Sequence, residues 1–335
     1  METFNLFDCL VGSVLSESAL KALEVQPLIK YLGPICEGAL GEIYGPRGIG
    51  KTFFRDALSL SLTRKLDMGA LKCEAAAGVL IVDGEMSLNL LKERQALSQN
   101  IGEPLKPLDI ISNEYLYRSG KPVINLADKL WRDAFIKLIE SGGDRWDVII
   151  FDNLSSFLPG VKENDQDAWG PINGFLLQLR WMGKAVIFVH HAGKSGDQRG
   201  TSSREDQLDF VLKLTHPAGY DPEDGCRFDA TFTKSRSLIG HEAASFTFEI
   251  TTHPNGGLIW IVTNQRESKK GTITALLGNG ISQKEVSDIM GVGKSYVSQI
   301  RKQAIADKLL EASGTSFTPA GMLKYGDIDV KRFIG

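Results

Sequence analysis

The chain has 335 residues, which is enough for a large core and for more than one domain. Hydrophobic residues make up 42% of the sequence and charged residues 24%, as is ordinary for a soluble globular protein. No apolar run is long enough to span a membrane, the first ten residues lack the basic stretch of a secretory signal, and the four scattered cysteines show no metal-binding or CxxC spacing. We therefore expect a cytoplasmic protein with reduced thiols and no membrane partner.

The net charge of −3 is unevenly distributed along the chain. Residues 267–335 carry ten Lys or Arg and seven Asp or Glu, so this part is basic while the rest of the chain is acidic. A small basic unit on an acidic body favours a polyanionic partner for the C-terminal part.

Apolar runs and helical patterns alternate through the first two thirds of the chain. After a mixed segment, in which residues 16–24 predict a short helix, short apolar runs are separated by segments of helical periodicity. The apolar runs are residues 41–45, 78–84, 108–112, 147–153 and 185–191, and the helical segments are residues 52–66, 86–97 and 127–141. This alternation indicates an α/β fold with a mainly parallel sheet that is covered on both faces.

The pattern changes after Leu208 to strand-like runs with turn signals between them, which predict an antiparallel extension of the same sheet. Residues 264–271 are polar and basic, as in a linker, and the remainder is helical. We therefore expect an N-terminal segment, residues 1–36, that is a candidate subunit-contact arm. An α/β domain, residues 37–265, and a small all-α domain, residues 266–335, follow it.

The octapeptide GPRGIGKT, residues 45–52, fits the pattern GxxxxGK[ST] and lies between a predicted strand and a predicted helix. Its glycines let backbone N–H groups curl around a phosphate at the positive end of the following helix. In this pattern Lys51 reaches the β- and γ-phosphates and Thr52 binds Mg²⁺. The sequence predicts an ATP and Mg²⁺ site formed by Gly45, Pro46, Arg47, Gly48, Ile49, Gly50, Lys51 and Thr52.

Carboxylates end two of the later apolar runs. Asp152 closes one run, where a P-loop ATPase needs a carboxylate for hydrated Mg²⁺. Glu85 follows another run, and a glutamate there can polarise a water for in-line attack on the γ-phosphate, which adds typically about 10²–10⁴-fold to the rate. We assign Glu85 as the base, and expect Asp83 to cap the following helix or to support Glu85.

Four stretches carry a family resemblance: GPRGIGKT, VLIVDGEM with LLKERQAL, VIIFDNLSSF, and VIFVHHAGKSGDQRGTSSREDQLDFVLKL. Over about residues 35–265 the chain resembles a RecA-like ATPase of the branch that contains DnaB-type ring helicases and RepA-type plasmid helicases. The His pair and the RGTSS segment of the last stretch are the features most specific to the RepA type. The resemblance implies that His191, or else His190, senses the γ-phosphate, which suits an imidazole because it can donate to a phosphate oxygen.

The stretch FTKSRSLIG, residues 232–240, resembles the KxR element of DnaB-type rings. The resemblance implies that Lys234 and Arg236 act across a subunit boundary, with Arg236 as the finger that stabilises charge on the transferring phosphoryl group. RepA-type relatives do not keep this arginine, so Arg199 and Arg204 in the preceding loop are alternative fingers.

Two loops, residues 155–169 and 192–203, are candidates to face a single DNA strand in a ring channel. The second loop carries Lys194 and Arg199, which suit phosphate contacts. The first loop has one lysine and three acidic side chains, so we do not expect its whole length to line the channel.

Residues 281–310 fit a helix-turn-helix. Ser282 and Glu285 form a capping box, Gly291 lies at the turn, and Val297 and Ile300 belong to the buried face of the second helix. The outward side chains of that helix are polar or basic, as major-groove binding requires: Lys294, Ser295, Tyr296, Ser298, Gln299, Arg301 and Lys302. Residues 309–326 are a candidate wing.

These features favour a ring-forming, hexameric DNA motor that serves as a replicative helicase of a plasmid or mobile element. It would hydrolyse Mg-ATP at subunit interfaces and move on single-stranded DNA, with the C-terminal domain on duplex. The alternative is an ATP-dependent DNA-binding regulator or loader, for transposition, partition or defence, that assembles on DNA without unwinding it. A small-molecule kinase is disfavoured because no acceptor pocket is evident and the tail is of a DNA-binding type.

Overall fold

The computed structural model describes residues 5–95, 101–161, 166–192, 207–217, 220–238, 243–252, 257–264, 269–325 and 330. Within these ranges, no helix combines the length and the apolarity needed to cross a membrane.

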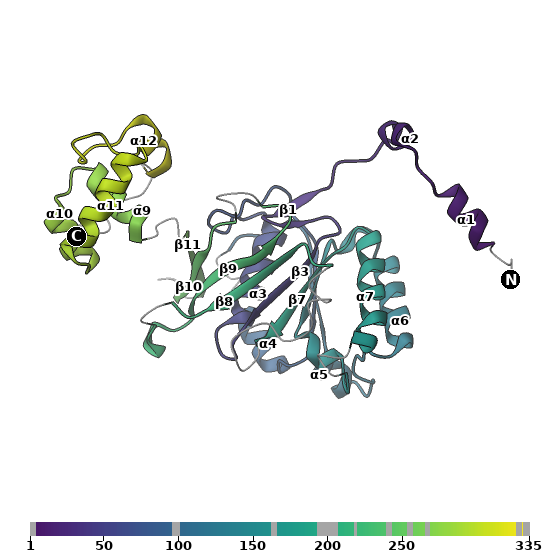
Figure 1. The fold of residues 1–335 in the computed structure, drawn as a ribbon. Helices are drawn as coiled ribbons and strands as arrows, with labels where there is room; N and C mark the ends of the chain where they lie inside the picture. Colours follow the sequence, from purple (N-terminus) through teal and green to yellow (C-terminus); the bar gives the residue numbers. More distant parts are fainter. Residues whose placement is uncertain are drawn as a thin grey trace.

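The main body is built on a nine-stranded sheet in the order β11-β10-β9-β8-β3-β7-β6-β4-β5 (Figure 1). The strands from β5 to β8 in this order run parallel, and β8 to β11 pair antiparallel. Their bounds are β3 Leu40–Gly45, β4 Val79–Asp83, β5 Leu108–Ser112, β6 Val148–Asp152, β7 Ala185–His191, β8 Phe210–Thr215, β9 Arg227–Ser235, β10 Phe246–Thr252 and β11 Leu258–Asn264. The predicted parallel sheet with an antiparallel extension is confirmed.

Helices cover both faces of the sheet, and α6 and α7 lie together on one side of it in Figure 1. The helix α3 (Lys51–Arg64) packs its apolar side chains into one core cluster, while α6 (Lys129–Gly142) and α7 (Gln166–Trp181) contribute to the other. Alternate residues of the parallel strands enter the two clusters, for example Ile81 into the first and Leu80 into the second. This double burial explains why these strands read as continuous apolar runs in the sequence.

Shorter elements join the strands. They are α4 (Leu88–Arg94), α5 (Asn113–Arg118) and the 3₁₀ helices η2 (Gly143–Arg145), η3 (Leu154–Phe157) and η4 (Pro222–Asp224). A small separate sheet pairs β1 (Lys30–Leu32) with β2 (Ile35–Cys36). The sheet order has one consequence for function: β7 lies between β3 and β6, so the carboxyl ends of these three parallel strands meet at one edge.

The N-terminal segment, residues 5–29, is exposed along its whole length. It contains α1 (Leu6–Gly12) and α2 (Glu17–Ala22), and in Figure 1 both helices lie away from the sheet. Ser16 caps α2 by accepting a hydrogen bond from the Ala19 N–H, so the short helix predicted within residues 16–24 is confirmed. The large apolar side chains of the N-terminal segment are exposed, including Leu6 and Val14, each at 77%.

The C-terminal helices have a core cluster of their own. The helices are α9 (Lys269–Gly278), α10 (Gln283–Met290), α11 (Lys294–Ala306) and α12 (Pro319–Tyr325). Val286, Val297 and Ile300 are buried in this cluster, as the sequence predicts. The predicted capping box of Ser282 and Glu285 is present, and Gly291 ends α10 in the left-handed conformation with φ 58°. A single antiparallel bridge, Leu310 with Phe317, closes the segment between α11 and α12.

Candidate functional site

The glycine-rich loop connects β3 to α3 and adopts a backbone that only glycine tolerates well. Gly48 and Gly50 have φ of 79° and 105°, in the left-handed region. A Cβ on Gly50 would also lie 2.4 Å from Sγ of Cys226, so this position has no room for a side chain. The loop therefore brings backbone N–H groups to the start of α3, where the helix dipole favours an anion.

Lys51 begins α3 and its side chain turns back over the loop. Its Nζ donates to the carbonyls of Gly45 at 2.9 Å and Pro46 at 2.7 Å. An ammonium has three donors, so this geometry fits a phosphate oxygen as a further acceptor. Burial lowers the pKa of Lys51 to about 8, and the nearby charges of Asp152 and Glu85 oppose the shift.

Glu85 and His191 meet at the carboxyl edge of the sheet. The Nε2 atom of His191 lies 3.7 Å from Oε2 of Glu85 and 3.1 Å from Nδ2 of Asn153. The Ser156 hydroxyl donates to Oε1 of Glu85 at 3.3 Å. The imidazole of His191, with Asn153 and Ser156, holds the pKa of Glu85 down to about 2, so the carboxylate is ionised at neutral pH. An ionised carboxylate held on two sides can accept a proton from a water.

Asp83 holds the turn that carries Glu85. Its Oδ1 accepts from the backbone N–H of Glu85 at 3.1 Å and of Met86 at 2.7 Å. The following helix α4 is instead capped by Ser87, whose hydroxyl accepts from the Leu90 N–H. We expected Asp83 either to cap the following helix or to support Glu85. In the structure Asp83 supports Glu85, and it does not cap α4.

Asp152 lies at the end of β6 with its side chain buried. Burial raises the pKa of Asp152, while the Arg55 guanidinium, 2.8 Å from its Oδ2, opposes the shift. Arg55 also donates to Asp83 at 2.6 Å.

The expected Mg²⁺ ligands have suitable chemistry. The hydroxyl of Thr52 and the carboxylate of Asp152 are oxygen donors, which Mg²⁺ prefers. Among the described residues, no group of three or more His, Cys, Asp or Glu side chains could form a metal cage. A small number of protein ligands is typical of a Mg²⁺ site. The ion usually keeps several waters and binds through one or two carboxylates together with substrate phosphates.

Lys234 and Arg236 lie at the opposite edge of the sheet from Lys51. The backbone N–H of Asp209, just before β8, donates to the Leu40 carbonyl at the start of β3, at 2.7 Å. Arg236 reaches the same Asp209, with its Nη1 3.4 Å from Oδ1. Because β3 has six residues at about 3.3 Å each, a full strand length separates Arg236 from the glycine-rich loop of its own chain.

The alternative cations cannot be located in the same way. Lys194, Arg199 and Arg204 lie outside the described residues, as does most of the loop at 192–203. Residues 155–161 and 166–169 of the other expected channel loop are described. The 3₁₀ helix η3 forms its start, and residues 166–169 belong to α7, so the prediction of a loop over the whole of residues 155–169 is wrong at this end. His190 is buried, with Nδ1 3.5 Å from the Ser155 hydroxyl, so of the His pair only His191 reaches Glu85.

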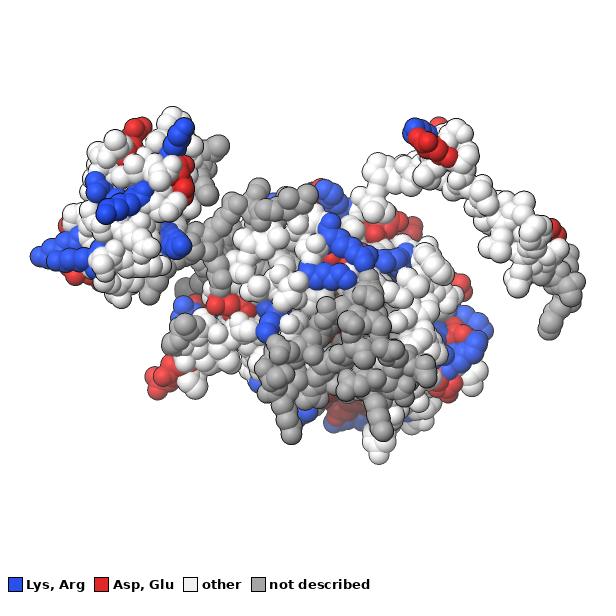
Figure 2. Space-filling model, in the orientation of Figure 1, with Lys and Arg blue, Asp and Glu red and all other residues white. Residues whose placement is uncertain are grey.

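The expected outward face of α11 is only partly exposed. Lys294, Ser295, Gln299 and Lys302 are exposed. Tyr296 packs against the C-terminal core and Ser298 is half-buried. Arg301 differs from the expectation, because its guanidinium donates to the carbonyls of Ser313 and Gly314 and ties α11 to the following segment. Figure 2 shows several basic side chains on the visible face of the C-terminal helices, with acidic side chains among them.

Sequence reasoning missed Arg55, Asn153 and Ser156. Asn153 and Ser156 follow Asp152 on a stretch that the sequence marks only as a strand end. Arg55 carried a usable signal, since it is a charge four residues after Lys51, on a helix whose sheet-facing positions are otherwise apolar or small.

Together, the glycine-rich loop, the strand order and the carboxylates at one sheet edge define a RecA-like P-loop ATPase. The chain belongs to the AAA-domain family, whose sequence model matches residues 10–197. No curated protein matches the chain by sequence.

The chain is similar to two solved structures. The flagellar accessory protein FlaH from Methanocaldococcus jannaschii is 16% identical, with a TM-score of 0.42, over 67% of this chain and 90% of its own. A KaiC-like protein from the hyperthermophilic archaeon Pyrococcus horikoshii OT3 is 15% identical, with a TM-score of 0.46, over 70% of this chain and 99% of its own.

Proposed function

We propose that this ATPase is a ring-forming DNA motor, a replicative helicase of a plasmid or mobile element. It hydrolyses Mg-ATP between subunits and moves on single-stranded DNA. The observation that carries the proposal is the division of the catalytic set: Lys51, Glu85 and His191 lie at one edge of the sheet, and Arg236 lies at the other. A site divided in this way is complete only where two copies meet.

In the proposed reaction the residues of one chain hold the triphosphate and orient the water. Lys51 and the loop N–H groups bind the phosphate oxygens, and Thr52 and Asp152 hold the metal, Asp152 through water. Bound Mg²⁺ would neutralise part of the negative charge of the phosphates. Glu85, kept ionised beside His191, accepts the proton of the attacking water.

His191 is suited to report the state of the γ-phosphate. Its Nε2 is shared between Glu85 and Asn153, so a phosphate that competes for this nitrogen changes the contacts of both. The strand β7 ends at His191, and residues 192–203, the expected channel loop, come next in the sequence. In this proposal, the change in the contacts of His191 when the phosphate is lost is transmitted to the segment that carries Lys194 and Arg199, the proposed contacts to single-stranded DNA.

Assembly into a homo-oligomer, a hexamer in this proposal, has a second support in the N-terminal segment. Between residues 5 and 29 the exposed large apolar side chains are Leu6, Phe7, Leu10, Val11, Val14, Leu15, Leu20, Leu23, Val25, Leu28 and Ile29. An apolar surface of this extent marks an interaction site. We propose that the segment, within residues 1–36, is an arm that packs on the neighbouring copy, since a repeated head-to-tail contact builds a ring.

We further propose that residues 266–335 form a helix-turn-helix domain that binds duplex DNA through Lys294, Ser295, Gln299 and Lys302, with Tyr296, Ser298 and Arg301 at its margin. Support comes from the separate core cluster of the C-terminal helices and from the basic, acid-free face of α11. Arg301 acts indirectly here, because it fastens the candidate wing to α11.

The same tail favours the second candidate function, a DNA-binding regulator or loader. In that case ATP drives assembly on DNA and no strand is separated. A forked DNA substrate distinguishes the two functions. The motor releases the displaced strand in an ATP-dependent reaction, and Lys51→Ala abolishes both strand release and ATP turnover. ATP turnover that single-stranded DNA stimulates, without strand release, would establish the regulator instead.

A further inference from the structure

A buried arginine joins three carboxylates beside the ATPase site. Arg55 lies on α3, four residues after Lys51, and its side chain is 1% exposed. Its Nη1 donates to Oδ2 of Asp83 at 2.6 Å and to Oδ2 of Asp152 at 2.8 Å. Its Nε and Nη2 donate to Oδ1 of Asp56 at 2.9 Å and 2.7 Å, and Nη2 also lies 3.7 Å from Sδ of Met86. These contacts use as many donors as a guanidinium has.

The two carboxylates that share Nη1 are direct neighbours in the sheet. Asp83 and Asp152 are register partners at the ends of the parallel strands β4 and β6. Two buried like charges at this spacing repel each other unless a cation lies between them. Arg55 is that cation, and it comes from the helix that carries Lys51 and Thr52.

Each carboxylate has a different task. Asp152 is the proposed metal-side carboxylate, and Asp83 accepts from the backbone N–H of Glu85 and of Met86. One nitrogen of Arg55 therefore fixes the orientation of the metal-side carboxylate and of the turn that presents the base.

We infer that Arg55 is a positioning residue for ATP hydrolysis: it couples the phosphate-binding helix to Asp152 and, through Asp83, to Glu85. The inference deepens the proposed ATPase mechanism and rests on it. The donors of Arg55 are taken up by Asp56, Asp83, Asp152 and Met86, so in this inference it acts through these groups and not on the nucleotide.

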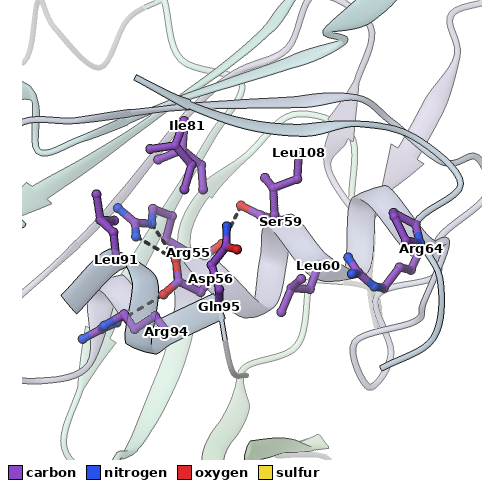
Figure 3. Close-up of a pocket in the computed structure, with 12 residues that line it drawn as sticks. Arg55, Asp56, Ser59, Leu60, Arg64, Ile81, Leu91, Arg94, Gln95 and Leu108 are labelled. Carbon is purple, nitrogen blue, oxygen red and sulfur yellow. Dashed lines mark hydrogen bonds and ion pairs between the residues drawn. The ribbon is translucent and has the colours of Figure 1, made fainter. Parts of the chain in front are cut away.

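The matched control is Arg94. Figure 3 shows Arg55 and Arg94 reaching Asp56 from α3 and α4 at the wall of a cavity of about 230 Å³, which residues of α3, α4, β4 and β5 line. Nη1 of Arg94 lies 3.3 Å from Oδ2 of Asp56, and its guanidinium lies 3.9 Å from the centre of the Phe53 ring. Arg94 thus shares one carboxylate with Arg55, and no contact described for it involves Asp83 or Asp152.

The test compares Arg55→Met with Arg94→Met in the full-length protein. For Arg55→Met we expect the half-saturating Mg²⁺ concentration of ATP turnover to rise by about tenfold or more, because partners of metal-side ligands typically contribute 10–100-fold. Binding of a fluorescent ATP analogue in EDTA should stay within about threefold of wild type, while the gain in affinity on adding Mg²⁺ should disappear. Arg94→Met should leave both measurements within about threefold of wild type.

Arg55→Met leaves two buried carboxylates without their cation, which is strongly destabilising. The double variant Arg55→Met with Asp83→Asn removes that repulsion, and the Asn amide oxygen can still accept from the Glu85 N–H. Thermal unfolding checks that it folds, and its Mg²⁺ response should remain weakened by about tenfold.

A folded double variant with a wild-type Mg²⁺ response would overturn the inference, as would an equal loss in Arg94→Met. Failure of the wild-type protein to hydrolyse ATP would instead overturn the proposed function. The Mg²⁺-dependent gain in analogue binding tests Arg55 separately from turnover.

Discussion

His191, the last residue of β7, holds its Nε2 atom 3.7 Å from Oε2 of Glu85, which follows β4 two strands away in the sheet. Neither strand pairs with the other, because β6 lies between them. Both side chains therefore extend across the end of β6 to make the contact. Asn153, which follows β6, has its Nδ2 atom 3.1 Å from the same imidazole nitrogen. This contact joins the proposed base to the proposed phosphate sensor.

The first prediction concerns Glu85. Replacing it by Gln keeps its size and removes the proton acceptor, so we expect kcat for ATP to fall by about 10²–10⁴-fold. The affinity for Mg-ATP, measured with a fluorescent analogue, should change little because Glu85 does not hold the phosphates. Glu93→Gln on the exposed face of α4 is the control and should turn over ATP at the wild-type rate. Full turnover by Glu85→Gln would remove it as the base.

The second prediction concerns the pH dependence of turnover. His191 is the main cause of the low pKa of Glu85, about 2, so in the wild type this carboxylate stays ionised at every pH above that value. In His191→Gln the pKa of Glu85 should rise toward its ordinary value of 4.5. A depressed carboxyl pKa keeps the active form as pH falls, and the variant loses that protection.

The measurement is kcat between pH 4.5 and pH 8, normalised for each protein to its own value at pH 7.5. At pH 4.5 the variant should retain a smaller fraction of its activity at pH 7.5 than the wild type does, because more of its Glu85 is protonated there. Identical normalised profiles would mean that His191 does not set the ionisation of Glu85.

The third prediction concerns the N-terminal segment. Deleting residues 5–27 removes only exposed side chains and leaves the hydrogen bond from the Glu37 N–H to the Ile29 carbonyl in place, so the remaining chain should unfold at the wild-type temperature. If the segment packs on a neighbour, the deletion should convert the oligomer formed with Mg-ATP and DNA into smaller species. Light scattering after size-exclusion chromatography measures the mass. An unchanged oligomer would show that other surfaces hold the copies together.

The fourth prediction concerns the exposed face of α11. Lys294→Ala with Lys302→Ala should weaken binding to duplex DNA similarly for all sequences, and should reduce the salt dependence of log K by about one for each lysine that neutralises a phosphate. ATP turnover without DNA should be unaffected. Lys284→Ala, exposed on α10, is the matched control. A wild-type salt dependence in the double variant would place duplex binding elsewhere.

The sheet could be predicted from the sequence because its parallel strands are buried on both faces. Runs such as residues 79–82 and 148–151 are continuous apolar stretches for that reason. The glycine-rich loop could also be predicted from the sequence, because its residue pattern lies between a predicted strand and a predicted helix. The capping box before α10 is a local signal, and it was found.

The positions of charges relative to the sheet could not be predicted in the same way. Arg55 belongs to the site because Asp83 and Asp152, 69 residues apart in the sequence, become register partners. That pairing follows from the strand order, which no local pattern encodes. For the same reason the sequence could relate Arg236 to the site only through a resemblance, whereas the fold puts a strand length between Arg236 and Lys51 of one chain.

The central claim is that the ATPase site is shared between two copies, and mixing of two inactive variants tests it most directly. The Lys51→Ala variant cannot bind the phosphates in its own site, but its Arg236 can still act in the site of a neighbouring copy. The Arg236→Ala variant binds the phosphates in its own site but supplies no cation to a neighbour. Arg227→Ala, at the start of the strand β9 that Arg236 follows, and paired with Glu249, is the control that should stay active alone.

Each inactive variant should show almost no turnover alone. An equal mixture should recover turnover at about a quarter of the wild-type rate, because random assembly restores both residues at about one interface in four. A mixture no more active than its separate components, in oligomers shown to exchange subunits, would contradict the shared site.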